Sequence, residues 1–537
     1  MVEDASPSPA DAQGGDDLRR GMARAARGER WAARALVVLF LALSLAPVWA
    51  LRYLPIQDYP QNLFQASLVC DALDGKSTGP FYDVHLHATY SAFFLLVWLF
   101  HFVVPIWQAG KAAVSVYFLL TAAAAWRLMA AAERDGRPAW GALLLFPAAF
   151  NAAYFLGFFH FLYAMPLLLL ALLDLRSAAS NGWTVPRAAL QVFYLLLLLI
   201  VHAFVVALYL LVALVWLIHA RARREPRARF GFWPGLVLAL LAIFLGALVD
   251  AGSAAASLAH LHLSDFIPPW RSLEFVLTLF TGLNGPLHPD LPTLFLWLAI
   301  IVFFAAIAWT RGRAASRAAK GSLLSPALWA CLVLAVAILA APFRIGSASY
   351  LNVRIAAALY LMLSAAAAAI VIPRRAIVPL ALLCLAAGAA SFRTQLALSR
   401  ETAAIDPIIA AMPPATPLLP LLFDPFSPRA DPYFFDPHLH DHFYIHLEKG
   451  GASPYLLEGP REQRAPVSLV PGTLPPAPPD IYRPFDFRRE LHGGYRYFLV
   501  RGGTPSLHRY MQTFARPLAS SGPWTLYERI ETPASTR

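Results

Sequence analysis

Charged residues are scarce in this chain. They make up 14% of its 537 residues, whereas a typical soluble domain carries about 25%. Hydrophobic residues make up 58%, and the mean hydropathy is +0.56. Apolar runs of roughly 20 residues, the length that crosses a bilayer as a helix, recur along the sequence. The deficit of charge therefore excludes an ordinary soluble protein and predicts a helical membrane protein.

Other absences narrow the function. Three cysteines are too few for a disulfide framework or a cysteine metal site. The sequence has no phosphate-cradling glycine loop, dinucleotide fingerprint or nucleophile elbow, which disfavours a nucleotide-dependent enzyme. The net charge of +11 comes largely from arginines in short loops between apolar spans, as the positive-inside rule predicts for cytoplasmic loops. It therefore does not indicate a nucleic-acid partner.

The apolar spans and basic loops together predict about 11 crossings, with the N-terminus in the cytoplasm. The spans lie at 31–51, 89–107, 111–132, 139–156, 157–175, 188–219, 232–251, 293–310, 323–342, 353–372 and 376–392. Two of them cannot be single crossings. Basic residues at both ends of 188–219 predict two short helices that turn near His202. The 89–107 segment is left as a half-inserted or surface helix on the far side.

The predicted organisation has three parts. Residues 1–30, rich in Asp, Arg, Pro and Gly, are typical of a disordered cytoplasmic tail. Residues 31–392 form the transmembrane region, with outer loops at 52–88 and 252–292. Residues 393–537 contain no span long enough to cross, and we expect a small extracytoplasmic α/β domain of about 140 residues.

Short runs predict the elements of that domain. Short strand-like runs alternate with longer helix-like stretches. The expected strands are 418–423, 495–500 and 524–530, the expected helices are 393–412 and 438–449, and 466–480 is expected to be a Pro-rich loop.

Asp58 lies in the polar segment 55–62, directly after the first apolar span. The flanking prolines restrict the backbone and keep this segment out of a helix. A carboxylate held at a membrane surface can take a proton from a hydroxyl group. The same residue also fits a solvated loop acid at the end of a helix.

A long N-terminal span, an Asp in the first outer loop, many short-looped spans and a C-terminal outer domain resemble the GT-C glycosyltransferases. The run Gln57-Asp58-Tyr59-Pro60-Gln61-Asn62-Leu63 resembles an Asp-x-Pro-x-His-Leu pattern of bacterial members. The resemblance implies a polyprenyl-phosphate-sugar donor and a role for Asp58 as base or metal-coordinating acid. Asn62 stands where the pattern has His, and an amide cannot shuttle a proton at neutral pH. Asn62 is therefore expected to support the site or bind the acceptor.

Two arginines flank the turn between the spans 323–342 and 353–372. Arg344 and Arg354 suit a lipid phosphate, because guanidinium binds phosphate oxygens bidentately. An arginine at a span end can also be a snorkelling anchor. In the GT-C family a basic residue near the late spans often faces the carrier phosphate, so the resemblance favours Arg354, with Arg344 second.

Polar residues elsewhere on the same side are further candidates. His160 and His202 lie at membrane depth, where polar groups usually face a cavity or a partner, although each also fits a packed histidine. Asp265, in the second outer loop, can line an acceptor cleft. His160, His202 and Asp265 are therefore expected to be acceptor-binding or supporting residues.

Two patterns can hold a metal. Asp83, His85 and His87 alternate, so an extended segment places them on one face, where they can bind a divalent cation such as Mg or Mn, or form an ordinary polar loop. The tail run 436–446 carries His438 and His442 at helical spacing but lacks the Glu of a metalloprotease motif.

These observations favour a glycosyltransferase of a bacterial inner membrane that moves a sugar from a polyprenyl-phosphate carrier to an extracytoplasmic acceptor. The alternatives are a transporter or flippase of lipid-linked or small substrates, and a non-catalytic membrane scaffold. The expected partners are membrane lipid and the lipid-linked donor.

Overall fold

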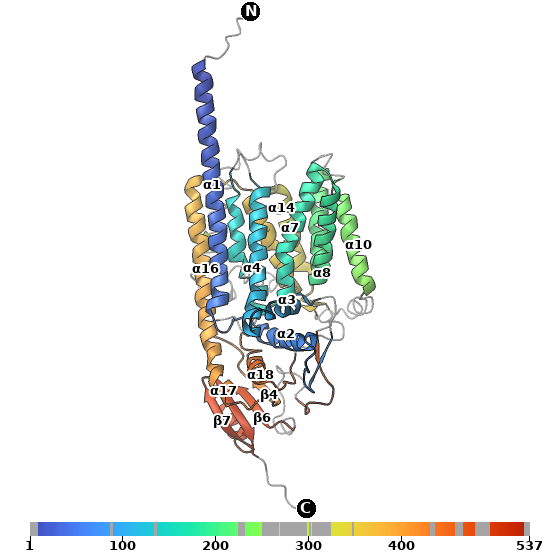
Figure 1. Ribbon diagram of the computed structural model, residues 1–537, viewed down its shortest axis with the longest axis vertical. Coiled ribbons are helices and arrows are strands. Elements are labelled where there is room, and N and C mark those ends of the chain that lie inside the picture. Colours follow the sequence, from blue (N-terminus) through green and yellow to red (C-terminus); the bar gives the residue numbers. More distant parts are fainter. Residues whose placement is uncertain are drawn as a thin grey trace, which may run out of the picture.

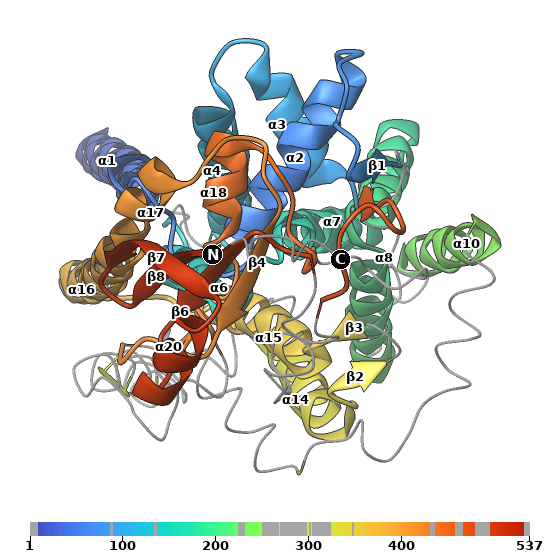
Figure 2. The same ribbon diagram turned by 90° about the horizontal axis from the view of Figure 1, so that it is seen from below.

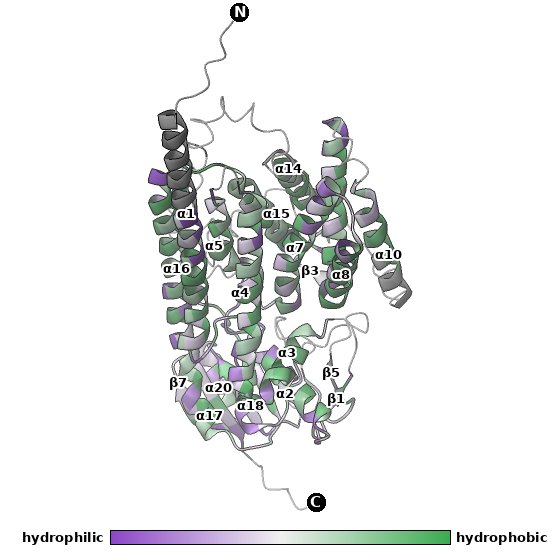
Figure 3. Cartoon of the chain, turned by 45° about the horizontal axis from the view of Figure 1, so that its top comes forward, coloured by the Kyte–Doolittle hydropathy of each residue, from purple (hydrophilic) through white to green (hydrophobic). Residues whose placement is uncertain are grey.

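The fold is that of a computed structural model. It describes residues 9–85, 90–133, 137–223, 231–249, 324–345, 348–429, 435–456, 466–477 and 494–530, with positions 268, 298, 299, 302 and 305. A bundle of long helices stands above a smaller domain that contains the C-terminal sheet (Figure 1). Apolar residues predominate along the bundle, and hydrophilic ones gather at the C-terminal domain (Figure 3). The protein is therefore a multi-pass membrane protein with a small strand-containing domain, as predicted.

Six described helices are long and apolar enough to cross a membrane. Shorter apolar helices, including α14 (Leu324–Ala340) and α10 (Trp233–Val249), stand beside them. The six are the Arg27–Ala50 part of α1 (Pro9–Ala50), α4 (Ile106–Ala131), α7 (Phe159–Asn181), α8 (Val185–Ala222), α15 (Leu351–Ala368), and α16 (Arg374–Thr402) with its continuation to Ala411.

The N-terminal tail departs from its prediction. Helix α1 begins at Pro9, so most of the segment 1–30 that we expected to be disordered is helical. Its Ala- and Arg-rich second half has high helix propensity, and the helix runs on directly into the first membrane span. The prediction of disorder rested on the low content of hydrophobic residues and did not take helix propensity into account.

Helix α8 is a hairpin, as its basic ends predict. The backbone leaves the helical region at His202 (φ −164°, ψ 99°). Gln191 donates a hydrogen bond to the Tyr209 hydroxyl, although 18 residues of continuous helix would separate them by about 27 Å. The chain therefore folds back at His202 and presents this histidine at the turn.

The end of the bundle nearest the C-terminal domain, here the domain end, carries two short helices. They are α2 (Tyr59–Leu73) and α3 (Ala92–His101), and both lie across the bundle beneath its long helices (Figure 1). With 10 residues, α3 is too short to cross. This confirms that 89–107 is not a crossing of its own.

The predicted span 139–156 is wrong as a single helix. It consists of η1 (Trp140–Leu144), α5 (Leu145–Ala149) and α6 (Ala152–Leu156). Asn151 causes the break, since its side chain accepts a hydrogen bond from the Tyr154 backbone at 3.2 Å and caps α6.

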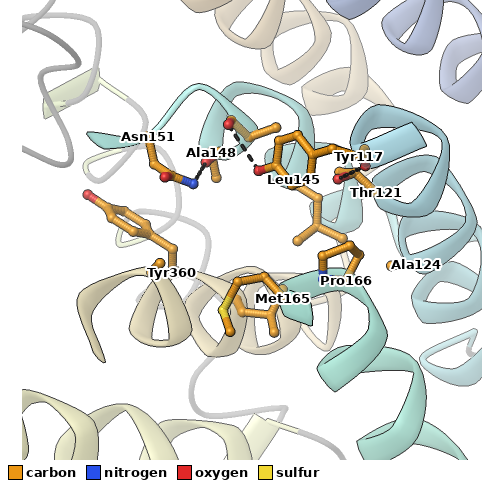
Figure 4. A pocket seen from close by; sticks show the side chains of 12 residues that line it. Tyr117, Thr121, Ala124, Leu145, Ala148, Asn151, Met165, Pro166 and Tyr360 are labelled. Carbon is orange, nitrogen blue, oxygen red and sulfur yellow. Dashed lines mark hydrogen bonds between the residues drawn. The ribbon is translucent and has the colours of Figure 1, made fainter. Parts of the chain in front are cut away.

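The backbone groups that this break frees need partners inside the bundle. The Tyr117 hydroxyl donates to the Ala149 carbonyl at 3.0 Å, and the Asn151 amide donates to the Ala148 carbonyl at 3.0 Å. These residues border a small cavity between α4, α5, α7 and α15 (Figure 4). Such partners let irregular backbone lie within the bundle.

The C-terminal domain is built on a four-stranded sheet in the order β4-β6-β8-β7. Strands β4 and β6 are parallel, and the other pairs are antiparallel. The strands are β4 (Leu418–Leu422), β6 (Tyr497–Arg501), β7 (Ala515–Ser521) and β8 (Trp524–Arg529). The three predicted strands are therefore present. Strand β7 and helix α20 (Pro505–Met511) were not predicted.

Strands β4 and β6 are buried on both faces of the sheet. Leu419, Leu421 and Phe498 pack against α20, while Leu418 and Leu499 join the main hydrophobic core. Every residue of β4 and β6 is buried. This double burial explains why these two strands, an edge strand and its neighbour, are mainly apolar in sequence.

A continuous helical path joins bundle and domain. Helix α16 runs without interruption past residue 392, the predicted boundary, and continues through η3 (Ala403–Ile405) into α17 (Asp406–Ala411). Tyr53, just after α1, hydrogen-bonds Asp406.

A two-stranded sheet forms a second connection to the C-terminal part of the chain. Strand β1 (Tyr82–Val84), in the first outer loop, pairs antiparallel with β5 (Val467–Leu469). The predicted Pro-rich loop 466–480 thus begins with a strand. Its apolar Val467 and Leu469 provide the side chains for this pairing.

Helix α18 (Phe443–Lys449) packs against α2 beneath the bundle (Figure 2). Phe443 lies 5.5 Å from Phe64, and Tyr444 stacks on Trp107 at 5.2 Å between ring centroids. Aromatic side chains of the C-terminal domain therefore pack against α2 and the start of α4.

The contact between η1 and α15 can be tested by substitution of Gly141 in η1. A Cβ at this position would lie 2.2 Å from the Ala367 carbonyl oxygen of α15. We expect Gly141→Ala to lower the free energy of unfolding by about 1–3 kcal/mol, the usual cost of overpacking. Thermal unfolding in lipid nanodiscs measures the change.

Gly388→Ala in α16 is the matched control, because its Cβ would meet nothing within 4 Å. It should gain helix propensity of up to about 1 kcal/mol. Equal unfolding temperatures for the two variants would contradict the close η1–α15 contact.

Candidate active site at the domain end of the bundle

Asp58 stands at the N-terminus of α2 but does not cap it. The residue occupies the N-cap position, yet its carboxylate makes no capping hydrogen bond. Pro60 in the first turn fixes the helix start. The preceding Gln57 is held on both sides, because its backbone N–H donates to the Phe155 carbonyl at 2.8 Å and its Oε1 accepts from the Asp436 backbone N–H at 3.0 Å. The carboxylate is therefore positioned by the backbone and turned away from its own helix.

The α6–α7 turn presses against Asp58 from the bundle side. A Cβ on Gly157 would lie 3.0 Å from the Cβ of Asp58, and Gly157 has φ +86°. Asn62 Nδ2 reaches the Gly157 carbonyl at 3.5 Å. Only glycine combines this positive φ with the lack of a Cβ that the close approach requires. Asn62 contacts the turn that packs on Asp58, and its role as a supporting residue stays a prediction.

His440 approaches Asp58 from the C-terminal domain. Its Nε2 lies 3.4 Å from Asp58 Oδ1, with side-chain exposures of 7% and 18%. The histidine-rich run 436–446 is recognisable in the sequence, but His440 was not a candidate site residue. Nothing in the sequence shows that a residue nearly 400 positions away folds onto Asp58. The available signal was the unusual density of histidines.

The turn that carries His440 is held by a buried histidine. His438 Nδ1 contacts Asp441 Oδ2 at 2.8 Å, and His438 Nε2 contacts Glu401 Oε2 at 3.4 Å. Burial lowers the pKa of His438, but these two carboxylates outweigh it and raise the pKa above the usual value. The predicted helix 438–449 is wrong over its first turn, since this local pairing replaces helix and α18 begins only at Phe443.

Burial raises the pKa of Asp58 to about 7. The hydrogen bond from Gln57 Nε2, at 3.3 Å, and the positive charge of Arg354 both act in the opposite direction but do not cancel the effect. An ordinary Asp has a pKa of about 4. A carboxyl that titrates near neutral pH is suited to general acid–base chemistry.

Arg354 lies in the first turn of α15. Its guanidinium stacks 4.5 Å above the Phe158 ring and 5.7 Å from that of Phe161. Its Nη1 lies 2.7 Å from His202 Nε2. Because arginine can only donate, His202 Nε2 must accept, which places the His202 proton on Nδ1.

A small polar cluster surrounds Arg354. The Tyr90 ring lies 5.0 Å from His202 and 6.2 Å from His160. Among the described residues, no group hydrogen-bonds Arg354 Nε, His202 Nδ1 or His160 Nε2. Three enclosed polar atoms of this kind, beside a cation, favour a polar ligand at this position.

Arg344 lies farther from this cluster. It is exposed on β2 (Arg344–Ile345), which forms a hairpin with β3 (Ala348–Ser349). The neighbouring Phe343 packs on Tyr350 at 4.8 Å, and Tyr350 lies 5.9 Å from Phe158. Arg344 is therefore one residue from an aromatic row that leads to Arg354.

The remaining candidates lie apart from Asp58 or outside the described residues. Asp83 and His85 lie 3.4 Å apart at strand β1, largely exposed. His87 and Asp265 are outside the described residues. No group of three metal-ligating side chains occurs among the described residues, and the expected divalent cation stays a prediction.

Comparisons with known proteins establish the fold. No family model and no curated protein matches the chain. The crystal structure of ArnT from Cupriavidus metallidurans bound to undecaprenyl phosphate is similar, with a TM-score of 0.52, 11% identity, and coverage of 93% of this chain and 99% of that one. The apo structure of the same protein gives 0.53, 13%, 93% and 98%. At these identities the likeness shows a shared fold over nearly the whole chain. The fold expected from the resemblance in the sequence is therefore confirmed.

The pKa of Asp58 can be measured without a substrate. Infrared spectroscopy of the protein in nanodiscs should show a carboxylic-acid band that titrates with a midpoint of about 7 and that Asp58→Asn removes. Arg354→Gln should raise this midpoint, because it removes a positive charge that stabilises the carboxylate. Arg375→Ala, which changes an exposed arginine in the first turn of α16, is the control. An unshifted midpoint in Arg354→Gln would contradict the coupling.

Proposed function

We propose that this protein is a glycosyltransferase that moves a sugar from a polyprenyl-phosphate carrier to a hydroxyl of an extracytoplasmic acceptor. The observation that carries the proposal is that Asp58 and Arg354 pack against the same α6–α7 turn of a GT-C-type bundle, Asp58 against Gly157 and the Arg354 guanidinium over Phe158. The Asp58 carboxylate can remove a proton, and the Arg354 guanidinium can bind a phosphate. The similar ArnT structure is bound to undecaprenyl phosphate, which supports a carrier of that chemistry.

Asp58 is the proposed base. In its ionised form it accepts the proton of the acceptor hydroxyl as the oxygen attacks the anomeric carbon. With a pKa near 7 the carboxylate is a stronger base than an ordinary Asp, yet it is still substantially ionised at neutral pH. Attack from the face opposite the phosphate gives inversion, as the family resemblance implies.

Arg354 is the proposed partner of the leaving group. As the bond from sugar to phosphate breaks, negative charge grows on the phosphate oxygens, and a guanidinium already fixed in a partly enclosed site stabilises that charge. His202 and His160 offer further polar atoms beside it. Arg344 adds a positive charge at the rim.

The proposal also orients the protein. The domain end lies outside the cytoplasm, the N-terminus lies inside, and the membrane is a bacterial inner membrane. The lipid tail of the carrier lies among the bundle helices while its phosphate reaches Arg354. The second outer loop, with Asp265, contributes to the acceptor cleft, and any divalent cation assists Asp58.

Lipid binding gives the first test. The protein is purified in nanodiscs, and its co-purifying lipids are identified by mass spectrometry. Polyprenyl phosphate or its glycosylated form should be enriched with wild type and lost with Arg354→Ala, because the phosphate loses its bidentate partner. Arg375→Ala, in the first turn of α16, should retain it, because α16 begins at the opposite end of the bundle (Figure 1). Equal bulk phospholipid in all samples would remove the basis for a carrier site.

Activity gives the second test, with the lipid-linked sugar so identified as donor. Asp58→Asn should reduce turnover by about 10²–10⁴, the usual contribution of a general base. For wild type, the rate should fall about tenfold for each pH unit below 7 and level off above it, because the ionised carboxylate is the reactive form. Asp83→Asn, at the exposed strand β1, should keep near-normal turnover. Wild-type rates in Asp58→Asn would rule out the base.

A further inference from the structure

A line of three buried histidines leads away from Asp58 through the C-terminal domain. His440 lies against Asp58, and His442 and His446 follow at ring-centroid separations of 6.3 Å and 6.5 Å. All three are at least 94% buried. The line ends at Gly450, whose carbonyl oxygen lies 3.1 Å from His446 Nδ1 and which is exposed to solvent. It therefore connects the candidate base with the surface of the domain.

The ring nitrogens of this line are largely unpaired. Within the described part of the chain, no group hydrogen-bonds either nitrogen of His440 or His442, or Nε2 of His446. Each buried polar atom left in this way costs about 1–3 kcal/mol. By contrast, His438 in the same run has a carboxylate on each nitrogen. Five unpaired ring nitrogens on three neighbouring histidines therefore need an explanation other than side-chain packing.

Two explanations fail. Arg354 and His160 are partly exposed, whereas His442 and His446 are only 0% and 2% exposed, so a sugar or phosphate does not reach these two histidines. A metal ion needs three or more converging ligands, and no such group occurs among the described residues. What an enclosed imidazole can still exchange is a proton.

We propose that His440, His442 and His446 form a proton relay from Asp58 to the outer surface at Gly450. The relay rests on the proposed function, in which Asp58 takes a proton from the acceptor. That proton must leave before the next turnover, and the carrier and the acceptor cover the mouth of the site.

The proton balance is simple. Protonated Asp58 gives its proton to His440 Nε2, and the proton on His440 Nδ1 moves to His442. His442 passes one to His446, whose Nδ1 proton leaves to water at Gly450. Each ring accepts at one nitrogen and loses a proton from the other, so none holds a lasting charge. A bridging water or a rotation of the rings closes the spacing between neighbours.

The electrostatics suit this role. Burial lowers the pKa of His440 to about 3 and that of His446 to about 4, and it lowers the pKa of His442 well below its ordinary value. At neutral pH each ring is therefore uncharged and offers one donor and one acceptor. His438, whose pKa is raised by its two carboxylates, lies beside this line.

Hydrogen–deuterium exchange of the Asp58 carboxyl tests the relay without any sugar transfer. The full chain in nanodiscs, saturated with undecaprenyl phosphate, is moved into deuterated buffer below pH 7. The shift of the carboxylic-acid band that Asp58→Asn removes is then timed. His442→Phe and His442→Gln should slow the exchange on the order of 10²-fold, because neither side chain can accept a proton at one atom and release it from another.

Tyr444→Phe is the matched control, since it alters the neighbouring buried residue of α18 and keeps its ring. Unchanged exchange in both His442 variants would overturn the relay, as would equal slowing in Tyr444→Phe or the absence of an Asp58 band. Exchange that depends on His442 in a protein without transferase activity would leave the relay standing and reject the proposed function.

Discussion

The desolvation of one carboxylate is the constraint on which the rest of the site depends. Asp58 precedes α2, but the groups that enclose it come from the α6–α7 turn and from the C-terminal domain. Taking a charge out of water is costly unless it is paired, and the positive charge of Arg354 only partly offsets the cost. Burial of Asp58 therefore lowers the stability of the fold, and the large apolar core compensates for this loss.

The sequence predicts the architecture better than the site. Apolar length and arginine placement were enough for the membrane class, the hairpin at His202 and the short helix α3, because bilayer thickness and charge act on local composition. The break at Asn151 escaped notice, since it depends on one capping side chain inside an otherwise apolar run. The part of helix α1 before residue 31 was not predicted, because its residues combine high helix propensity with low hydrophobicity.

The site was predicted only where one residue carries its own signal. Asp58 stands out through its flanking prolines and Arg354 through its charge near a span end. Three features depend on tertiary packing between distant segments: the packing of Asp58 and Arg354 against one turn, the contact of Arg354 with His202, and above all the approach of His440.

The two connections of the C-terminal domain also constrain its movement. The domain is attached through the unbroken α16–α17 path at one edge and through the β1–β5 ladder at the other. The contact of α18 with α2 adds a third attachment. A domain held at three places resists rotation as well as translation, and these attachments together fix where His440 lies relative to Asp58. The position of His440 is therefore a property of the whole domain and not only of the turn that carries it.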